Sequence, residues 1–213
     1  MKITVLGATG ATGRLVVEQA LARGDEVVAY VRNPQGLQAR PGLQVVAGQL
    51  SDTPALQAAI AGSDAVLSCL GTQEKKNVDL MQKSVPLIIQ AMQGAQVQRL
   101  VPMSAYGVGE TARTASLVAR IAYKLVVGPV YRDKERSEAL LAGSGLKWTG
   151  VYPVILTDGP LADADVRPLS QVHKVAGLPK VSRASVARAL LDAAADDRTI
   201  GQKLVVSSPG SVR

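Results

Sequence analysis

The sequence predicts an α/β fold: a single domain with a doubly wound parallel sheet and helices on both faces. Three observations predict it. Short apolar segments rich in Val, Ile and Leu, typical of buried parallel strands, alternate with segments of helical periodicity. The connections between these segments are short, as in repeated strand–helix–strand units. A glycine-rich turn joins the first predicted strand directly to the first predicted helix.

The predicted elements follow one another closely along the chain. Apolar segments predict strands at 3–6, 26–31, 43–47, 65–70, 100–103, 147–151 and 203–207. Helical spacing predicts a helix from the glycine-rich turn to Gly24, and further helices at 54–61, 77–92, 112–127, 131–141 and 182–195. Asp52 and Ser182 are expected N-caps, Pro86 is expected to kink a helix, and Gly128–Pro129 is expected to end one.

Length and rare residue types limit the architecture. The 213 residues predict one domain, 1–213, with a loop-rich segment around 156–180 beside the substrate and a short strand at 171–175. A single cysteine, Cys69, and a single histidine, His173, exclude an internal disulfide and a multi-histidine metal site, so no metal is expected. Cys69 is expected to be a buried thiol. Because no apolar run could span a bilayer and no signal-peptide pattern begins the chain, a cytoplasmic location is expected.

The charge balance narrows the class of partner. The formal net charge of +7 is compatible with nucleic acid, an anionic membrane or an acidic small molecule. The basic residues are scattered along the chain, and only 3% of residues are aromatic, so stacking platforms for single-stranded nucleic acid are not expected. We therefore expect neither a nucleic-acid nor a membrane partner. A polyanionic dinucleotide is the simplest partner for this charge.

Three glycines, Gly7, Gly10 and Gly13, form the pattern G-x-x-G-x-x-G between the first strand and the first helix. The first permits a sharp exit from the strand, the second lets a pyrophosphate approach the backbone, and the third lets the helix pack closely. The unpaired N–H groups at the helix start suit a phosphate, and Thr9 and Thr12 add hydroxyl donors. A tight turn without a ligand is the alternative. A nucleoside-triphosphate P-loop is excluded because no Lys follows Gly13.

Arg32 stands at the end of the second predicted strand, where a carboxylate would bind the ribose hydroxyls of NAD. A guanidinium at this position suits a 2′-phosphate, so the sequence predicts a preference for NADP(H) over NAD(H). A solvated loop arginine is the alternative interpretation.

Several motifs, in this order, resemble one family. They are GATGATGR at 7–14, Arg32, Ser104 after the fifth strand, Lys-x-x-x-Glu at 134–138 and SGLKWTGVYP at 144–153. Together they resemble the atypical short-chain dehydrogenase/reductases, in particular the NAD(P)H-binding group of NmrA-like proteins and flavin/biliverdin-IXβ reductases. The resemblance spans nearly the whole chain and implies a Rossmann-type NAD(P)-binding domain.

The resemblance also implies which residues bind the cofactor. The pyrophosphate would lie on the glycine-rich turn, formed by Gly7, Ala8, Thr9, Gly10, Ala11, Thr12 and Gly13. Arg32 would bind the 2′-phosphate, and Gln49 and Leu50 would contact the adenine. On the nicotinamide side the resemblance implies contacts with Gly71, Thr72, Ser104, Lys134, Pro153, Val154 and Ile155.

Two departures from the family pattern affect these assignments. Gln49 stands where the family often has Asp, but its amide can still bond the adenine amino group. The family's catalytic Tyr-x-x-x-Lys would place a tyrosine at position 130, which is Val130. Tyr131 stands three residues before Lys134, so it can share a helix face with that lysine. Ser104, Tyr131 and Lys134 are therefore the candidate catalytic residues, with Tyr131 as the proton donor.

Three functions are compatible with these residues. The favoured one is an NADPH-dependent oxidoreductase that transfers a hydride to a small, flat acceptor such as a flavin or quinone. The alternative is an NADP(H)-binding redox sensor of the NmrA type that performs no turnover. An isomerase or epimerase of nucleotide sugars is less compatible, since that chemistry depends on the missing tyrosine. A monomer or a homodimer is expected.

Overall fold

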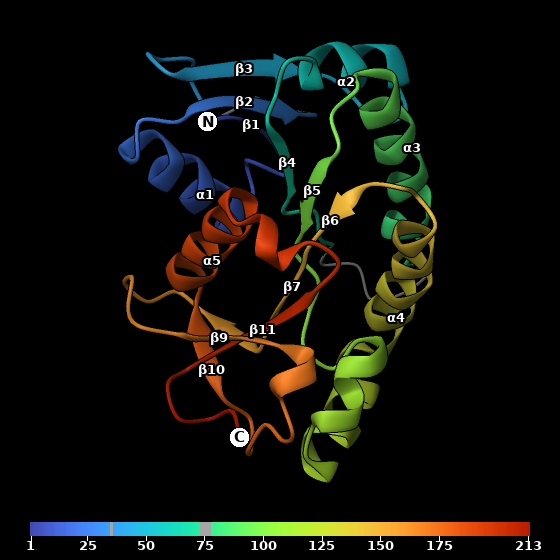
Figure 1. Ribbon diagram of the computed structural model, residues 1–213, viewed down its shortest axis with the longest axis vertical. Helices are drawn as coiled ribbons and strands as arrows, with labels where there is room; N and C mark the ends of the chain where they lie inside the picture. Colours follow the sequence, from blue (N-terminus) through green and yellow to red (C-terminus); the bar gives the residue numbers. More distant parts are fainter. Residues whose placement is uncertain (35, 73–77) are drawn as a thin grey trace.

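The computed structural model describes residues 1–34, 36–72 and 78–213. Its main sheet has six parallel strands in the order β3-β2-β1-β4-β5-β6 (Figure 1). The strands are β1 (Lys2–Leu6), β2 (Glu26–Val31), β3 (Leu43–Ala47), β4 (Ala65–Ser68), β5 (Arg99–Pro102) and β6 (Lys147–Trp148). The order reverses between β1 and β4, so the chain leaves these two strands toward opposite sides of the sheet. Such switch points are where open α/β sheets bind ligands.

Helices cover both faces of this sheet, as predicted (Figure 1). One face carries α1 and α5, which pack on each other, and the other carries α2, α3 and α4. The helices are α1 (Ala11–Ala22), α2 (Thr53–Ile60), α3 (Leu80–Gly94), α4 (Leu117–Ala142) and α5 (Arg183–Ala195). The predicted N-caps are confirmed, because the side chains of Asp52 and Ser182 accept from the N–H groups of Ala55 (3.1 Å) and Ser185 (3.0 Å).

Alternate residues of the strands build two separate apolar cores. In β1, Ile3 and Val5 belong to the core beneath α1 and α5, whereas Leu6 belongs to the core beneath α2 and α3. The apolar residues of β2 divide in the same way. Because successive strand residues point to opposite faces, strands apolar at almost every position are buried on both sides.

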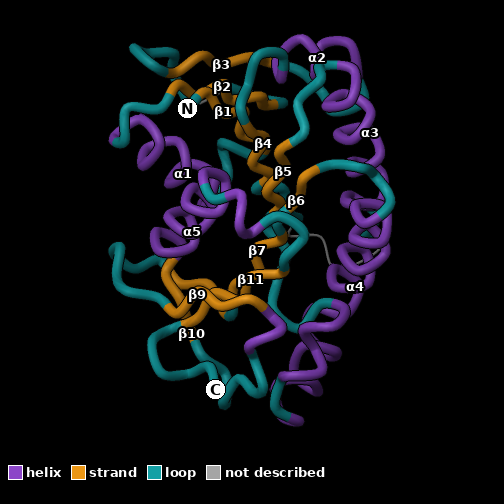
Figure 2. The backbone as a smooth tube through the Cα atoms, in the orientation of Figure 1, coloured by secondary structure: helices purple, strands orange, loops and turns teal. Residues whose placement is uncertain are grey.

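A smaller group of strands lies below the main sheet (Figure 2). In the order β7-β11-β9, the central strand β11 pairs parallel with β7 and antiparallel with β9, and β10 pairs parallel with β8. The bounds are β7 (Gly150–Pro153), β8 (Ile155–Thr157), β9 (Asp165–Pro168), β10 (Lys180–Ser182) and β11 (Lys203–Ser207). Short 3₁₀ turns lie at η1 (Gly109–Thr114), η2 (Leu169–Gln171) and η3 (Asp197–Thr199).

The expected helix end at Gly128–Pro129 is wrong. The structure has one helix, α4, across this point, with Pro129 in its interior. A proline removes one backbone hydrogen bond and crowds the preceding turn, but packing of the same helix against α3 outweighs that cost. Pro86 also lies inside a helix, α3. That helix begins at Leu80 in the described chain, and its expected start at Asn77 lies outside the described residues.

Two strand predictions near the carboxyl end also need correction. The single strand expected at 147–151 is divided, because Lys147 and Trp148 pair with β5 whereas the chain from Gly150 onward pairs with β11. The short strand expected at 171–175 is absent from this described segment, whose regular pairing is made earlier by β9. The sequence of β9 has little apolar alternation, so its pairing with β11 came only from tertiary contact.

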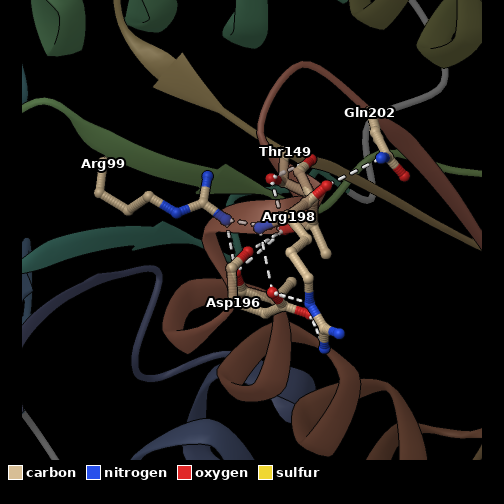
Figure 3. Close-up of polar contacts among 7 residues, drawn as sticks. Arg99, Thr149, Asp196, Arg198 and Gln202 are labelled. Carbon is tan, nitrogen blue, oxygen red and sulfur yellow. Dashed lines mark hydrogen bonds and ion pairs between the residues drawn. The ribbon is translucent and has the colours of Figure 1, made fainter.

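Arg99, at the start of β5, is a buried arginine that joins three segments (Figure 3). Its guanidinium donates to the carbonyl of Lys147 at 2.9 Å, to the carbonyl of Ala193, and to Thr199 Oγ1 at 3.0 Å. Burial lowers the pKa of Arg99, and nearby carboxylates oppose the shift. The arginine thereby fixes the last turn of α5 and the η3 turn to the sheet.

Replacing Arg99 tests this network. Arg99→Met keeps the apolar stem but removes the donors, and each buried acceptor left unpaired costs ~1–3 kcal/mol. We expect the free energy of unfolding, measured by urea denaturation, to fall by about 2–4 kcal/mol. Arg188→Met, on the exposed side of α5, is the matched control and should change it by less than about 0.5 kcal/mol. Equal stability of the two variants would contradict a stabilising role for Arg99.

Candidate functional site

The glycine-rich turn has the geometry that its spacing predicted. Gly7 has φ of +77°, and a Cβ there would lie 2.9 Å from the carbonyl carbon and oxygen of Cys69. A Cβ on Gly13 would lie 2.1 Å from the Gly7 carbonyl oxygen, so only glycine lets α1 approach the strand end this closely. Gly10 is the N-cap of α1 and is exposed. No side-chain cap hydrogen bond is made at Gly10, and the first N–H groups of an α-helix have no partner within the helix.

A cavity of about 430 Å³ lies beside this turn, and we call it the crevice cavity. The ends of β2 and β4, the loop after β3 and one face of α3 complete its walls. Its lining includes the predicted cofactor residues Gly7, Thr9, Gly10, Arg32, Gln49, Leu50 and Gly71. Ala8, Thr12 and Gly13 are buried behind the turn, so of the two expected threonines only Thr9 reaches the cavity.

Two arginines stand near the crevice cavity in different roles. Arg14 is held by backbone carbonyls, with Nε donating to Thr9 at 3.0 Å and Nη1 donating to Gly36 at 3.2 Å. Arg32 lines the cavity and is exposed, and its guanidinium has no hydrogen-bond or ion-pair partner among the described residues. The helix start and Arg32 are therefore two positively charged features that face one cavity.

Tyr30 is a wall residue that sequence reasoning missed. Its hydroxyl donates to the Gln49 carbonyl at 2.9 Å, across from the end of β3. A Cβ on Gly48 would lie 2.2 Å from that hydroxyl, so the glycine leaves room for the ring. The adjacency of Gly48 to the predicted strand was the signal that could have found this contact.

A second cavity, of about 470 Å³, lies between α4 and the strands β5, β6 and β7, and we call it the helix–sheet cavity. Most of its lining is apolar. Its polar lining includes Ser104, Lys134, Glu138 and Tyr152. Ser104 Oγ donates to Glu138 Oε1 at 2.7 Å. Ser104 and Lys134 are predicted site residues, whereas Glu138 and Tyr152 were missed as site residues.

Lys134 and Glu138 lie one helical turn apart on α4, which explains the Lys-x-x-x-Glu spacing. Lys134 Nζ donates to the Met103 carbonyl at 3.1 Å. Burial lowers the pKa of Lys134, and the charge of Glu138 opposes this shift. Burial raises the pKa of Glu138, while hydrogen bonds from Ser104 and Tyr152 oppose that shift. The pKa of Tyr152 is also raised, by burial and by the nearby carboxylate.

Asp133 fixes the position of α4. Its carboxylate accepts from the N–H groups of Met81 at 2.8 Å and Gln82 at 3.0 Å, and from Gln82 Nε2 at 3.1 Å. It therefore caps the start of α3, whose own N-cap residue, Asp79, makes no side-chain cap hydrogen bond. Because Lys134 follows Asp133 directly, the cap also fixes where the lysine enters the cavity.

The remaining predicted residues lie elsewhere. Tyr131 lines neither cavity, and its hydroxyl donates to the Tyr106 carbonyl at 3.0 Å, so its role as proton donor stays a prediction. Pro153 ends β7, Val154 follows it, and Ile155 begins β8. Thr72 is the last described residue before the gap at 73–77.

Comparisons with known proteins agree with this geometry. A family model described as NAD(P)H-binding matches residues 7–197. The chain belongs to the NAD(P)H-binding family. The predicted resemblance and the Rossmann-type fold are thereby confirmed.

Three relatives illustrate the match. A short-chain dehydrogenase/reductase from Veillonella parvula in complex with NADP has a TM-score of 0.83 at 18% identity, covering 100% of this chain and 96% of that one. A candidate NADH-flavin reductase from Streptococcus pneumoniae has a TM-score of 0.81 at 25% identity, covering 98% and 99%. An uncharacterized chloroplastic protein of Arabidopsis thaliana is 27% identical over 169 residues, covering 75% of this chain. The chain spans 60% of that relative's length.

Other site types find little support in the described part of the chain. Within it, no helix has the length and apolar character needed to cross a membrane. No group of three or more His, Cys, Asp or Glu side chains gathers there as a metal site would require.

Cys69, just after β4, allows a test of whether its thiol is buried. Burial raises the pKa of its thiol to about 12. Since only the thiolate reacts, we expect alkylation by iodoacetamide at pH 8 to be about 10³-fold slower than for a thiol with its ordinary pKa. Cys69 is the chain's one cysteine, so mass spectrometry reads it directly, and the protein unfolded in guanidinium is the control. Equal labelling of native and unfolded protein would contradict the burial.

Proposed function

We propose that this protein is an NADPH-dependent oxidoreductase that reduces a small, flat acceptor such as a flavin or quinone. One observation carries the proposal: the N-cap of α1, which has no side-chain cap, and Arg32, which has no partner within the described residues, line the same cavity. A dinucleotide with a 2′-phosphate has two anionic groups that match these two features. Membership of the NAD(P)H-binding family supports the same cofactor class.

The residues fit this cofactor. The pyrophosphate would accept hydrogen bonds from the N–H groups at the start of α1, where Gly10 leaves the backbone accessible. Arg32 would bind the 2′-phosphate, and Gln49 and Leu50 would flank the adenine. Gly71 and Thr72 would lie near the ribose of the nicotinamide half, and Pro153–Ile155 near the carboxamide.

The reduced nicotinamide supplies a hydride when bound. The protein's contribution is to orient it and to exclude water. Ser104 follows the carboxyl end of β5, and Lys134 reaches the same place from α4, because its Nζ donates to the Met103 carbonyl. The nicotinamide half of the cofactor would bind there. Lys134 would hold the ribose, a positioning role that suits a lysine anchored to the Met103 carbonyl.

The placement of Tyr131 is equally compatible with a second candidate function. Its hydroxyl is bonded to the backbone of Tyr106 and does not line the cavity that holds Lys134. A protein that binds NADP(H) as a redox sensor, without turnover, would need no such acid. The two functions differ in turnover, so one experiment separates them.

The experiment is a titration of the purified protein with NADPH and NADH, read by nicotinamide fluorescence, followed by flavin and quinone acceptors. We expect tight NADPH binding and acceptor-dependent oxidation. Binding without oxidation by any acceptor would favour the sensor. Absence of binding by either cofactor would contradict both functions.

Arg32→Asp tests the cofactor preference. Because one charge-assisted hydrogen-bonded contact is worth ~1.5–3 kcal/mol, we expect the Kd for NADPH to rise by about 10- to 100-fold. The Kd for NADH, which has no 2′-phosphate, should change by less than about 2-fold. Arg188→Asp makes the same charge change on the exposed side of α5 and is the control. An equal loss of affinity for both cofactors would refute the 2′-phosphate assignment.

A further inference from the structure

Glu138 is a partly buried carboxyl group on the helix–sheet cavity, and its neighbours come from three elements. Ser104 Oγ lies 2.7 Å from its Oε1, and the Tyr152 hydroxyl donates a hydrogen bond to the same carboxylate. The first neighbour follows β5, the second lies in β7, and Glu138 itself lies in α4. Three elements far apart in sequence therefore meet at one carboxyl group.

The surroundings of this carboxyl raise its pKa. The cavity beside it is lined mainly by apolar groups, including Val85, Ile88 and Trp148. Burial in such surroundings raises the pKa of Glu138, and this outweighs the opposing effect of its hydrogen bonds. The charges of Lys203 and Lys134 also oppose this shift, while the Lys134 ammonium donates to the Met103 carbonyl and burial lowers its pKa.

The same cavity extends from Glu138 to exposed residues at its rim. There Lys203 Nζ forms an ion pair with Glu110 Oε2 at 2.9 Å, and the Glu110 side chain is 61% exposed. Gly109 stands beside Glu110, and a Cβ on it would lie 3.6 Å from Glu138 Oε2. The carboxyl therefore has Ser104 on one side and a solvent-facing opening on the other.

We propose that Glu138 stores the proton for acceptor reduction and delivers it through the Ser104 hydroxyl. The inference rests on the proposed function, since it places the reacting acceptor beside Ser104. The acceptor gains a hydride, with its two electrons, from the reduced nicotinamide. It gains one proton from the Ser104 O–H as the Glu138 O–H proton moves to Ser104 Oγ. Glu138 is left as a carboxylate and regains a proton from water at the cavity rim, so one proton is taken up per turnover.

The hydrogen bond between the two side chains can reverse to permit this transfer. When Glu138 is ionised, Ser104 donates to it. When Glu138 is protonated, the carboxyl donates and the Ser104 proton is free to point toward the acceptor. Tyr152 donates to the carboxylate and stabilises the form left after transfer. Tyr131, whose hydroxyl is bonded to Tyr106, is not needed.

The groups that face Glu138 define what else could titrate. Lys134 and Glu135 lie on the same helix, Lys203 on β11, Glu110 in η1 and Tyr152 on β7. The residues that α3 contributes to the cavity are apolar: Met81, Val85 and Ile88. Lys203 and Glu110 pair with each other at the rim, and the raised pKa of Tyr152 keeps that hydroxyl protonated in the neutral range.

The test compares wild type with Glu138→Gln in single-turnover oxidation of bound NADPH by a flavin, measured across pH. The protonated carboxyl is the donor, so the wild-type rate should fall as pH rises through the raised pKa of Glu138. Glu138→Gln should be about 100-fold slower at low pH, since general acids contribute ~10²–10⁴-fold, and its rate should be independent of pH. Glu26→Gln, which removes an exposed glutamate at the start of β2, away from this cavity, should match wild type.

A second measurement needs no turnover. Infrared spectra of the cofactor-free protein should contain a protonated-carboxyl C=O band that is lost in Glu138→Gln and persists above the pH at which ordinary glutamates ionise. Ser104→Ala should keep this band but lose the fast, pH-dependent phase. The Kd for NADPH, unchanged within about 2-fold in Glu138→Gln, reports that the variant is folded.

Each result has a distinct meaning. A Glu138→Gln variant that oxidises NADPH at the wild-type rate and with the wild-type pH profile would overturn the proton route and leave the reductase intact. A Glu138 band that titrates in the ordinary carboxyl range would also overturn it, whatever the rates. Wild-type protein that binds NADPH without oxidation by any acceptor would overturn the proposed function, and the proton route with it.

Discussion

The close approach of α1 to the end of β1 is the constraint on which the site depends. A Cβ on Gly13 would lie 2.1 Å from the Gly7 carbonyl oxygen, so no other residue type permits this packing. The approach sets the start of α1 at the carboxyl edge of the sheet, next to the end of β4. There Gly10, the N-cap of the helix, and the cation Arg32 border the same cavity. The affinity for a ligand with two anionic groups therefore depends on the close packing that Gly13 permits.

A second constraint acts on the other side of the sheet. Asp133 caps α3 from a neighbouring helix and so sets the position of α4. Lys134 and Glu138 then enter a largely apolar cavity, where burial shifts both pKa values toward the neutral forms. The protein therefore has a positively charged crevice cavity, lined by Arg32, and a helix–sheet cavity lined by Ser104, Lys134 and Glu138. The first suits binding of a charged cofactor, and the second suits control of a proton.

The sequence pattern correctly predicted the elements whose structure depends on residues close together in the chain. The five strands from β1 to β5 were found within two residues, because their runs of branched apolar residues suit only positions buried on both faces. The caps at Asp52 and Ser182 were found because capping is made within three residues. The predicted helix end at Pro129 was wrong, because packing of α4 against α3 outweighs the cost of a proline inside the helix. The sequence pattern also failed at β9, whose pairing with β11 has no local signal.

The sequence by itself determined the family, the sheet and the phosphate-binding turn, since each follows from the spacing of residues close together in the chain. Only the tertiary structure decided which polar groups meet inside the protein. Ser104 and Glu138 are 34 residues apart and bond at 2.7 Å, and Tyr131 is directed to the Tyr106 carbonyl. The pKa of a side chain depends on burial and on partners from distant elements. No pattern of neighbouring residues contains that information.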